Sequence, residues 1–240
     1  MPAASFRAPP DHACIKVVAS FEALIATPFA DGVNALCWPR PLEGDFGEII
    51  TALGLREETE IFTLEDENLI DLDLSPAGQI ARDRLLADQR LLRDAGLAPT
   101  LDCIPAYPRE AEPGPVPIDV YSFHADSAPI QADTYLCSYN EASSEGLRPA
   151  DAICCIDVPE RRAALLARYG GADDAGFAAY CREHFYDLHY DAVPGAEPYA
   201  FGLGNLWRIT TSWPDSPVPP CVHRAPTTKP GQMPRLLLIS

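Results

Sequence analysis

Hydrophobic and polar residues recur at helical spacing in the first half of the chain. Residues 46–55 show this pattern, and residues 14–26 suit a short strand followed by a helical turn. Ser75 followed by Pro76 predicts the start of a longer helix, because serine caps a helix N-terminus and proline fits the first helical position. Gly96 is typical of a helix end, so we expect this helix to continue almost to that residue.

The pattern changes after a proline-rich stretch. Residues 99–117 contain six prolines, which predict an irregular connection. Beyond it, short runs rich in valine, tyrosine, phenylalanine and threonine favour strands over helices. The expected strands are residues 118–123, 134–139, 199–211 and 235–239.

A helical segment interrupts these strands at about residues 148–198. Asp157 with Glu160 three residues later resembles a capping box, which marks a helix start, and Gly170 predicts the end of that helix. A second helix is expected at about residues 174–190. Because it lies between the strands, this insert is a natural lid and specificity element.

These elements predict an α+β fold. We expect a single domain over residues 1–240, with a mainly helical part at 1–117. The remaining residues, 118–240, are expected to form a strand-rich core that contains the helical insert. A chain of 240 residues can bury such a core without disulfide bonds.

Charge excludes some partners. The chain has 18 basic and 35 acidic residues, which gives a net charge of −17. This excess repels a nucleic-acid backbone and an anionic membrane surface, so we expect neither as a partner. A small molecule or another protein remains, and the oligomeric state cannot be predicted.

The cysteines and the first thirty residues bear on the compartment. The eight cysteines form no C-x-x-C pair, which favours reduced and mostly buried thiols over a zinc ribbon or a disulfide framework. Lys16 and Glu22 interrupt the first apolar run, so it lacks the layout of a secretory signal. We expect a cytoplasmic protein.

The most informative motif is His124-Ala125-Asp126, with His223 97 residues after the aspartate. On a strand, residues i and i+2 point to the same side, so His124 and Asp126 can bind one ion together. Two imidazoles and one carboxylate on one side of a metal suit Fe(II) and leave positions open for substrate and oxygen. Because H-x-D often arises by chance, a surface histidine with a capping aspartate is the competing interpretation.

Arg235 strengthens the metal hypothesis. It opens an apolar strand twelve residues after His223. A guanidinium held beside a metal can bind a carboxylate with two hydrogen bonds. A pocket for 2-oxoglutarate needs this cation, because the carboxylate remote from the metal requires a fixed positive charge.

With these residues, the chain resembles the Fe(II)- and 2-oxoglutarate-dependent oxygenase superfamily. The likeness covers about residues 118–240 and rests on the motif H-x-D…H followed by an arginine. A bacterial family of unknown function is still more similar. The similar segments are Val33 to Arg40, Phe123 to Asp126, Thr134 to Tyr139, Glu145-Gly146, His223 to Pro226 and Arg235 to Leu238.

The resemblance implies a distorted double-stranded β-helix, a jelly roll of the cupin type, under a helical N-terminal half. It further implies that His124, Asp126 and His223 bind Fe(II) and that Arg235 binds 2-oxoglutarate. The implied activity uses molecular oxygen to oxidise an unactivated C–H bond of a small molecule. Hydroxylation is the default outcome, with desaturation or cyclisation as variants.

The chain departs from the superfamily pattern at Leu237, where many members have serine or threonine as a second contact to 2-oxoglutarate. Tyr135 or Tyr139 are candidates to replace it, and a core role for either is the competing interpretation. Arg224 and Trp207 are weaker candidates for substrate contacts. Arg224 is expected on the opposite strand face from His223, and a buried position in the core is favoured for Trp207.

Two other functions stay open. The same three ligands suit a metal-binding protein without catalysis, which holds zinc or another ion. A second alternative is an interaction module that presents the acidic stretch at residues 57–73 to a basic partner. His184 and His189 lie five residues apart on an expected helix, a spacing that does not suit a shared metal, so we expect surface or packing roles for them.

Overall fold

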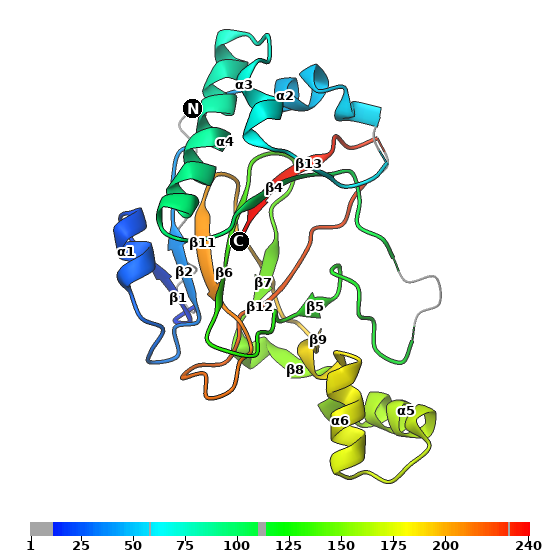
Figure 1. Ribbon diagram of the computed structural model, residues 1–240. Helices are drawn as coiled ribbons and strands as arrows, with labels where there is room; N and C mark the ends of the chain where they lie inside the picture. Colours follow the sequence, from blue (N-terminus) through cyan, green and yellow to red (C-terminus); the bar gives the residue numbers. More distant parts are fainter. Residues whose placement is uncertain (1–11, 58, 110–113, 230) are drawn as a thin grey trace.

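The computed structural model describes residues 12–57, 59–109, 114–229 and 231–240. Residue 58, in the acidic stretch, lies outside them. Within these ranges the fold is mixed α+β, with two sheets that are almost wholly antiparallel (Figure 1). The larger sheet has the order β1 (Ile15–Val17), β2 (Ala35–Trp38), β11 (Leu206–Thr210), β6 (Asp133–Ser138), β13 (Arg235–Ile239), β4 (Thr100–Ile104), β3 (Phe62–Thr63).

The smaller sheet carries the strands that matter most for the candidate site. Its described strands follow the order β10 (Tyr199–Ala200), β7 (Glu145–Leu147), β12 (Val222–Arg224), β5 (Phe123–His124), β9 (His189–Ala192), β8 (Ala152–Cys154). Among the strands in the described residues, β1 and β2 of the larger sheet are the one pair that runs parallel. In the larger sheet β13 lies between β4 and β6, which buries both edges of the C-terminal strand.

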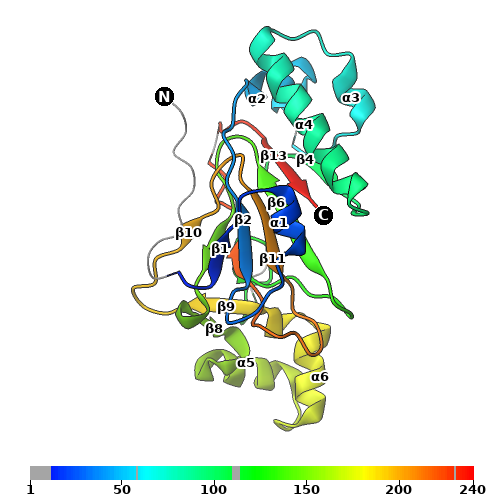
Figure 2. The same ribbon diagram turned by 90° about the vertical axis from the view of Figure 1, so that its left-hand side faces the viewer.

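Helices cover one face of the larger sheet and one end of the molecule. They are α1 (Phe21–Ala26), α2 (Phe46–Ala52), α3 (Asp66–Ile70) and α4 (Pro76–Asp94). Figures 1 and 2 show α2, α3 and α4 together at one end, opposite the two helices of the insert. Ile49 of α2 and Leu85 of α4 are fully buried in one cluster with Cys103 and Leu238 of the sheet.

The longest helix, α4, confirms the expectation from its end signals. The Ser75 hydroxyl accepts a hydrogen bond from the Gly78 backbone N–H, and Pro76 occupies the first helical position. Gly96 has a φ of 80°, the left-handed conformation that ends a helix and that glycine adopts without strain.

The opposite face of the larger sheet packs against the smaller one. Leu136, Trp207 and Leu237 from the larger sheet share a cluster with Tyr199 of β10 and the nearby Phe201. This second cluster is the interior of a two-layer sandwich.

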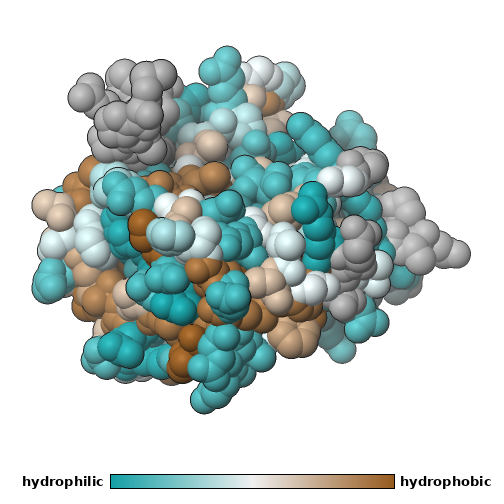
Figure 3. Space-filling model, turned by 90° about the horizontal axis from the view of Figure 1, so that it is seen from above, coloured by the Kyte–Doolittle hydropathy of each residue, from teal (hydrophilic) through white to brown (hydrophobic). Residues whose placement is uncertain are grey.

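Seen from above, hydrophobic residues on the surface are interspersed among hydrophilic ones (Figure 3).

The N-terminal part is less purely helical than its pattern predicts. Residues 12–109 supply four strands of the larger sheet, β1 to β4, in addition to the four helices. The boundary at residue 117 therefore does not separate a helical layer from a strand-rich one. Short strands such as Phe62–Thr63 give too few alternating positions to be recognised in the sequence.

The insert lies where it was expected, between the end of β7 at Leu147 and the start of β10 at Tyr199. It contains β8, α5 (Pro159–Tyr169), α6 (Ala175–Glu183) and β9, with short 3₁₀ turns at Pro149–Asp151, Cys155–Asp157 and Tyr186–Leu188. A further 3₁₀ turn lies at Leu55–Glu57, after α2. The insert is thus partly sheet, because β8 and β9 extend the smaller sheet beside β5.

Four expected elements differ from the structure. The strand expected at residues 199–211 is two strands, β10 and β11, which belong to different sheets. The helix expected at residues 174–190 ends at Glu183, where Phe185 adopts a φ of 58° and turns the chain into β9. The strand expected at 118–123 begins only at Phe123. The helix start at α5 has Val158 at its cap position with no side-chain hydrogen bond, so Asp157 does not form the expected capping box.

The thiols agree with a reduced protein. All eight cysteines are free, and six of them are buried. Among the helices in the described residues, none is long and apolar enough to cross a bilayer.

Candidate metal centre

The site begins with two histidines that face each other across neighbouring strands. His124 on β5 and His223 on β12 are directly paired in register, so both side chains point to the same face of the smaller sheet. Their ring centroids lie 4.7 Å apart. Gly146 of β7 pairs with the other side of His223, and a Cβ there would collide with the rings of Tyr199 and Phe201.

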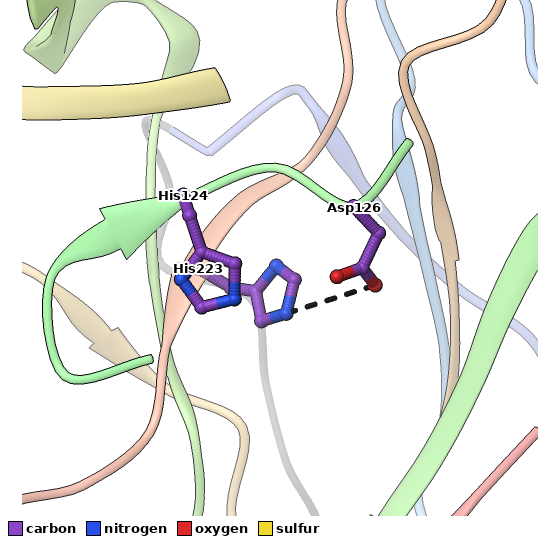
Figure 4. A group of neighbouring side chains, drawn as sticks. All are labelled: His124, Asp126 and His223. Carbon is purple, nitrogen blue, oxygen red and sulfur yellow. Dashed lines mark ion pairs between the residues drawn. The ribbon is translucent and has the colours of Figure 1, made fainter. Parts of the chain in front are cut away.

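Asp126 joins the two histidines from the segment that follows β5 (Figure 4). Its carbonyl accepts a hydrogen bond of 2.7 Å from the Ser212 N–H, which holds the backbone beyond the strand. The carboxylate Oδ2 lies 3.9 Å from His223 Nε2 and accepts a hydrogen bond of 2.5 Å from the Thr134 hydroxyl. One ligand atom from each of the three residues lies within 4.8 Å of the other two.

Hydrogen bonds fix which nitrogen of each ring faces the centre. His124 Nδ1 lies 2.8 Å from the Ser122 carbonyl and His223 Nδ1 lies 3.2 Å from the Cys221 carbonyl. A carbonyl only accepts, so each Nδ1 carries a proton, and Nε2 is the atom that a neutral ring can offer to a metal. Burial and then the nearby His223 lower the pKa of His124 to about 4, so this imidazole is neutral at pH 7. Neutral imidazole is the form that binds metals.

The three side chains line a pocket of about 260 Å³ between the two sheets. Arg235 and Leu237 of β13 line the same pocket from the larger sheet. Tyr107, from the connection after β4, lines it as well. The spacing of the motif therefore brings His124, Asp126, His223 and Arg235 to one cavity, as expected.

Arg235 is buried, and no acidic side chain among the described residues forms an ion pair with it. It is 6% exposed, and its Nη2 donates to the Tyr107 hydroxyl at 3.2 Å. Within the described residues, its buried Nη1 has no hydrogen-bond partner. Burial lowers the pKa of this guanidinium, although the nearby Tyr107 opposes the shift. Unpaired buried donors are rare in native proteins and usually have a functional explanation.

Tyr135 and Tyr139 do not line this pocket, which corrects their expected role. Along β6 the side chains alternate, and Thr134 and Leu136 line the pocket. Tyr135 and Tyr139 therefore point to the helix-covered face, where both belong to the first core cluster. The Tyr139 hydroxyl donates to Asp88 of α4 at 2.8 Å, which explains the burial of its polar end.

Arg224 and Trp207 also lie away from the pocket. Arg224 points to the outer face of the smaller sheet, where it pairs with Glu145 at 2.7 Å and covers the Phe123 ring at 4.3 Å. Trp207 is 1% exposed and stacks on Phe201 with ring centroids 4.4 Å apart. Both residues have structural contacts that account for them without a substrate.

Sequence reasoning missed three contributors to this region. Tyr107 lies in the proline-rich connection, Thr134 is the second residue of β6, and His189 was expected on a helix in a surface or packing role. His189 is buried on β9 and pairs in register with His124. The strand pattern places Thr134 on the same face as Leu136, which also lines the pocket, so the sequence could have indicated this threonine. The positions of Tyr107 and His189 depend on tertiary structure.

The chain matches no family model, no curated protein and no solved structure. The interpretation of the site therefore depends on its own geometry and on the motif residues.

Proposed function

We propose that the protein is a non-haem Fe(II)- and 2-oxoglutarate-dependent oxygenase that oxidises an unactivated C–H bond of a small molecule. One observation carries the proposal. Two imidazole Nε2 atoms and a carboxylate share a pocket with a buried guanidinium that has an unpaired donor.

The strand order supports a double-stranded β-helix. In the larger sheet β11, β6, β13 and β4 are consecutive neighbours, and in the smaller sheet β10, β7, β12 and β5 are. Along the chain these eight strands pass repeatedly from one sheet to the other, as in a jelly roll of two four-stranded layers. The remaining strands extend the two sheets at their edges.

The donor set fits a divalent transition metal. Two neutral imidazoles and one carboxylate on one side of an ion match the ligands of non-haem Fe(II) oxygenases. The backbone carbonyls that accept from each Nδ1 orient the rings, which is how metal-binding histidines are usually held. A metal–ligand distance of about 2.1 Å places neighbouring ligands about 3 Å apart. The ligand atoms, which lie up to 4.8 Å apart, would then approach one another by up to about 2 Å when an ion binds.

The pocket also fits a co-substrate with a carboxylate remote from the metal. Arg235 offers the free Nη1, and the Tyr107 hydroxyl beside Nη2 would supply the second polar contact for which the sequence suggested Tyr135 or Tyr139. Leu237, two residues along the strand, contributes only an apolar wall. The small volume suits 2-oxoglutarate and a small substrate.

Each residue has a defined task in this proposal. His124, Asp126 and His223 would hold Fe(II), Thr134 would orient the Asp126 carboxylate, and Arg235 would bind the co-substrate. When bound, Fe(II), 2-oxoglutarate and O₂ supply the oxidation, in which one oxygen atom enters the substrate and the other enters succinate with release of CO₂. The protein supplies ligand geometry and a pocket that limits access of water.

The test is anaerobic addition of Fe(II) and then 2-oxoglutarate to metal-free protein, followed by visible absorption. We expect the charge-transfer band of an iron-bound 2-oxo acid in the wild type and none in His223→Ala. Arg235→Met should need about 10- to 100-fold more 2-oxoglutarate, because a charge-assisted hydrogen bond contributes about 1.5–3 kcal/mol. His184→Ala and Arg224→Met are matched controls outside the pocket and should behave as the wild type.

Two results would contradict the proposal. Iron binding without the band at any concentration of 2-oxoglutarate would favour the alternative of a metal-binding protein without catalysis. An unchanged band in His223→Ala would exclude this histidine as a ligand.

A further inference from the structure

The two candidate ligand histidines belong to a row of three. His223 pairs with His124, and His124 pairs in turn with His189 on the next strand, β9. The ring centroids of His124 and His189 lie 5.8 Å apart. Because residues paired in register share one face of a sheet, all three imidazoles point into the sandwich. The third one comes from the insert at residues 148–198.

His189 is connected to His124 through Ser122. The Ser122 hydroxyl lies 2.9 Å from His189 Nδ1 and 2.6 Å from the Asp119 carbonyl. A hydroxyl has one proton, and the carbonyl can only accept it, so His189 Nδ1–H donates to the Ser122 oxygen. The carbonyl of the same serine accepts from His124 Nδ1. One residue thus bonds both histidines.

The backbone around this serine is otherwise held by a turn and by the insert. The Asp119 carboxylate accepts from the Ser122 N–H at 3.1 Å, and the Ala125 N–H donates to the Leu188 carbonyl at 2.9 Å. His189 itself is 6% exposed. It is not one of the three residues whose ligand atoms converge, so it acts on the centre only through its neighbours.

We propose that His189 is a positioning residue of the metal centre, whose hydrogen bond to Ser122 fixes the carbonyl that orients His124. The insert thereby sets the affinity of the centre for its metal. This inference rests on the proposed function only in that His124 is a metal ligand; it needs neither 2-oxoglutarate nor oxidation.

The expected effect follows from the position of the hydrogen bond. Loss of a group that orients a metal-binding histidine typically costs 10- to 100-fold in metal affinity. His189 acts one residue further away, through Ser122, so we expect about a tenfold loss. Burial lowers the pKa of His189 to about 4, so the side chain is neutral at pH 7 and acts as a hydrogen-bond donor rather than as a cation.

The experiment is titration of metal-free protein with Co²⁺, read by calorimetry and by the visible d–d spectrum, with thermal unfolding beside it. His189→Leu keeps the bulk and removes the donor, whereas His189→Asn places an amide N–H where Nδ1 was. We expect about tenfold weaker Co²⁺ binding and an altered spectrum in the leucine variant, and affinity within about threefold of the wild type in the asparagine variant.

Two further variants keep the test decisive if the leucine variant folds poorly. Ser122→Ala removes the same hydrogen bond, together with the bond from the serine hydroxyl to the Asp119 carbonyl, and should weaken Co²⁺ binding at least as much. Adding His189→Leu to Ser122→Ala should weaken binding little further, because the hydrogen bond from His189 is already absent. His184→Ala, in the same insert but packed between Tyr180 and Tyr186, should bind Co²⁺ as the wild type does.

The outcomes separate this inference from the proposed function. No Co²⁺ binding by the wild type would overturn both. Binding by the wild type with equal affinity in His189→Leu would overturn the role of His189 alone. Equal weakening in the leucine and asparagine variants would also overturn it, because packing and not the hydrogen bond would then be responsible.

Discussion

Arg235 and Arg40 are equally buried, yet we expect their replacement by methionine to have opposite effects on stability. Each is 6% exposed. Arg40 binds both carboxylate oxygens of Asp88, at 2.6 and 2.9 Å, and the Gly204 carbonyl. Arg235 has one neutral partner, Tyr107, and an unpaired Nη1. The Arg40 guanidinium joins the helical layer to the sheet, whereas in the proposed function the Arg235 guanidinium binds the co-substrate.

The magnitudes follow from these contacts. Breaking a buried ion pair costs about 3–5 kcal/mol, so Arg40→Met should lower stability by that amount. Arg235→Met removes a buried unpaired donor, which relieves about 1–3 kcal/mol, and costs about 1 kcal/mol for the lost bond to Tyr107. The net effect for Arg235→Met is a gain of about 1 kcal/mol, which raises the melting temperature by about 2–4 °C in a chain of this size.

The pKa of Arg235 agrees in sign with this expectation. Burial lowers the pKa of Arg235 in the folded protein below its value in the unfolded chain, and the nearby Tyr107 partly opposes this shift. The charged form is therefore less stable in the folded state than in the unfolded one, and this cost is present throughout the range in which arginine is protonated, neutral pH included. The cost disappears in Arg235→Met.

The assay is urea and thermal unfolding of metal-free protein at pH 7, without and then with Mn²⁺ and 2-oxoglutarate. We expect Mn²⁺ and 2-oxoglutarate together to stabilise the wild type. In Arg235→Met, 2-oxoglutarate should add little to the stability of the Mn²⁺-bound protein. If the free energy of unfolding of Arg235→Met falls by several kcal/mol, as that of Arg40→Met should, the Arg235 guanidinium stabilises the fold. That result would refute the reasoning that its unpaired donor serves a ligand.

Three further predictions concern the remaining residues. Tyr139→Phe should lose about 1.5–3 kcal/mol of stability, because the Tyr139 hydroxyl donates to the buried carboxylate of Asp88. Titration of this variant should show unchanged affinity for 2-oxoglutarate. A weaker affinity would indicate that Tyr139 contacts the co-substrate. Tyr107→Phe should weaken 2-oxoglutarate binding about 3- to 10-fold in the same titration, and an unchanged value would exclude its hydroxyl as a contact. Arg224→Ala, which breaks the half-exposed pair with Glu145, should cost about 0–1 kcal/mol in urea unfolding and leave Co²⁺ affinity intact; a large affinity loss would contradict its outward position.

Local signals predicted what is determined locally. Ser75-Pro76 and Gly96 define α4 through backbone hydrogen bonding and φ preference, which depend little on the rest of the chain. His124 and Asp126 also converge as their spacing suggests, although Asp126 lies beyond the end of β5 and its backbone is held by Ser212.

Tertiary structure determined what was missed. The alternation along β6 placed Tyr135 and Tyr139 on one face correctly, but which face meets the pocket depends on strand pairing that no local pattern records. His189 was assigned to a helix because nothing between Glu183 and the histidine breaks a helix in sequence; pairing of β9 with β5 overrides that preference. Tyr107 reaches Arg235 because it lies just after β4, the strand that pairs with β13.

The most direct test of the central claim is an anomalous difference map from crystals soaked anaerobically with Mn²⁺ and 2-oxoglutarate. We expect one strong peak about 2.0–2.3 Å from His124 Nε2, His223 Nε2 and an Asp126 carboxylate oxygen. The same map series should show a ligand carboxylate within hydrogen-bond distance of Arg235 Nη1. A strong peak elsewhere with none at these three side chains, or bound metal with Arg235 still unpaired, would contradict the account.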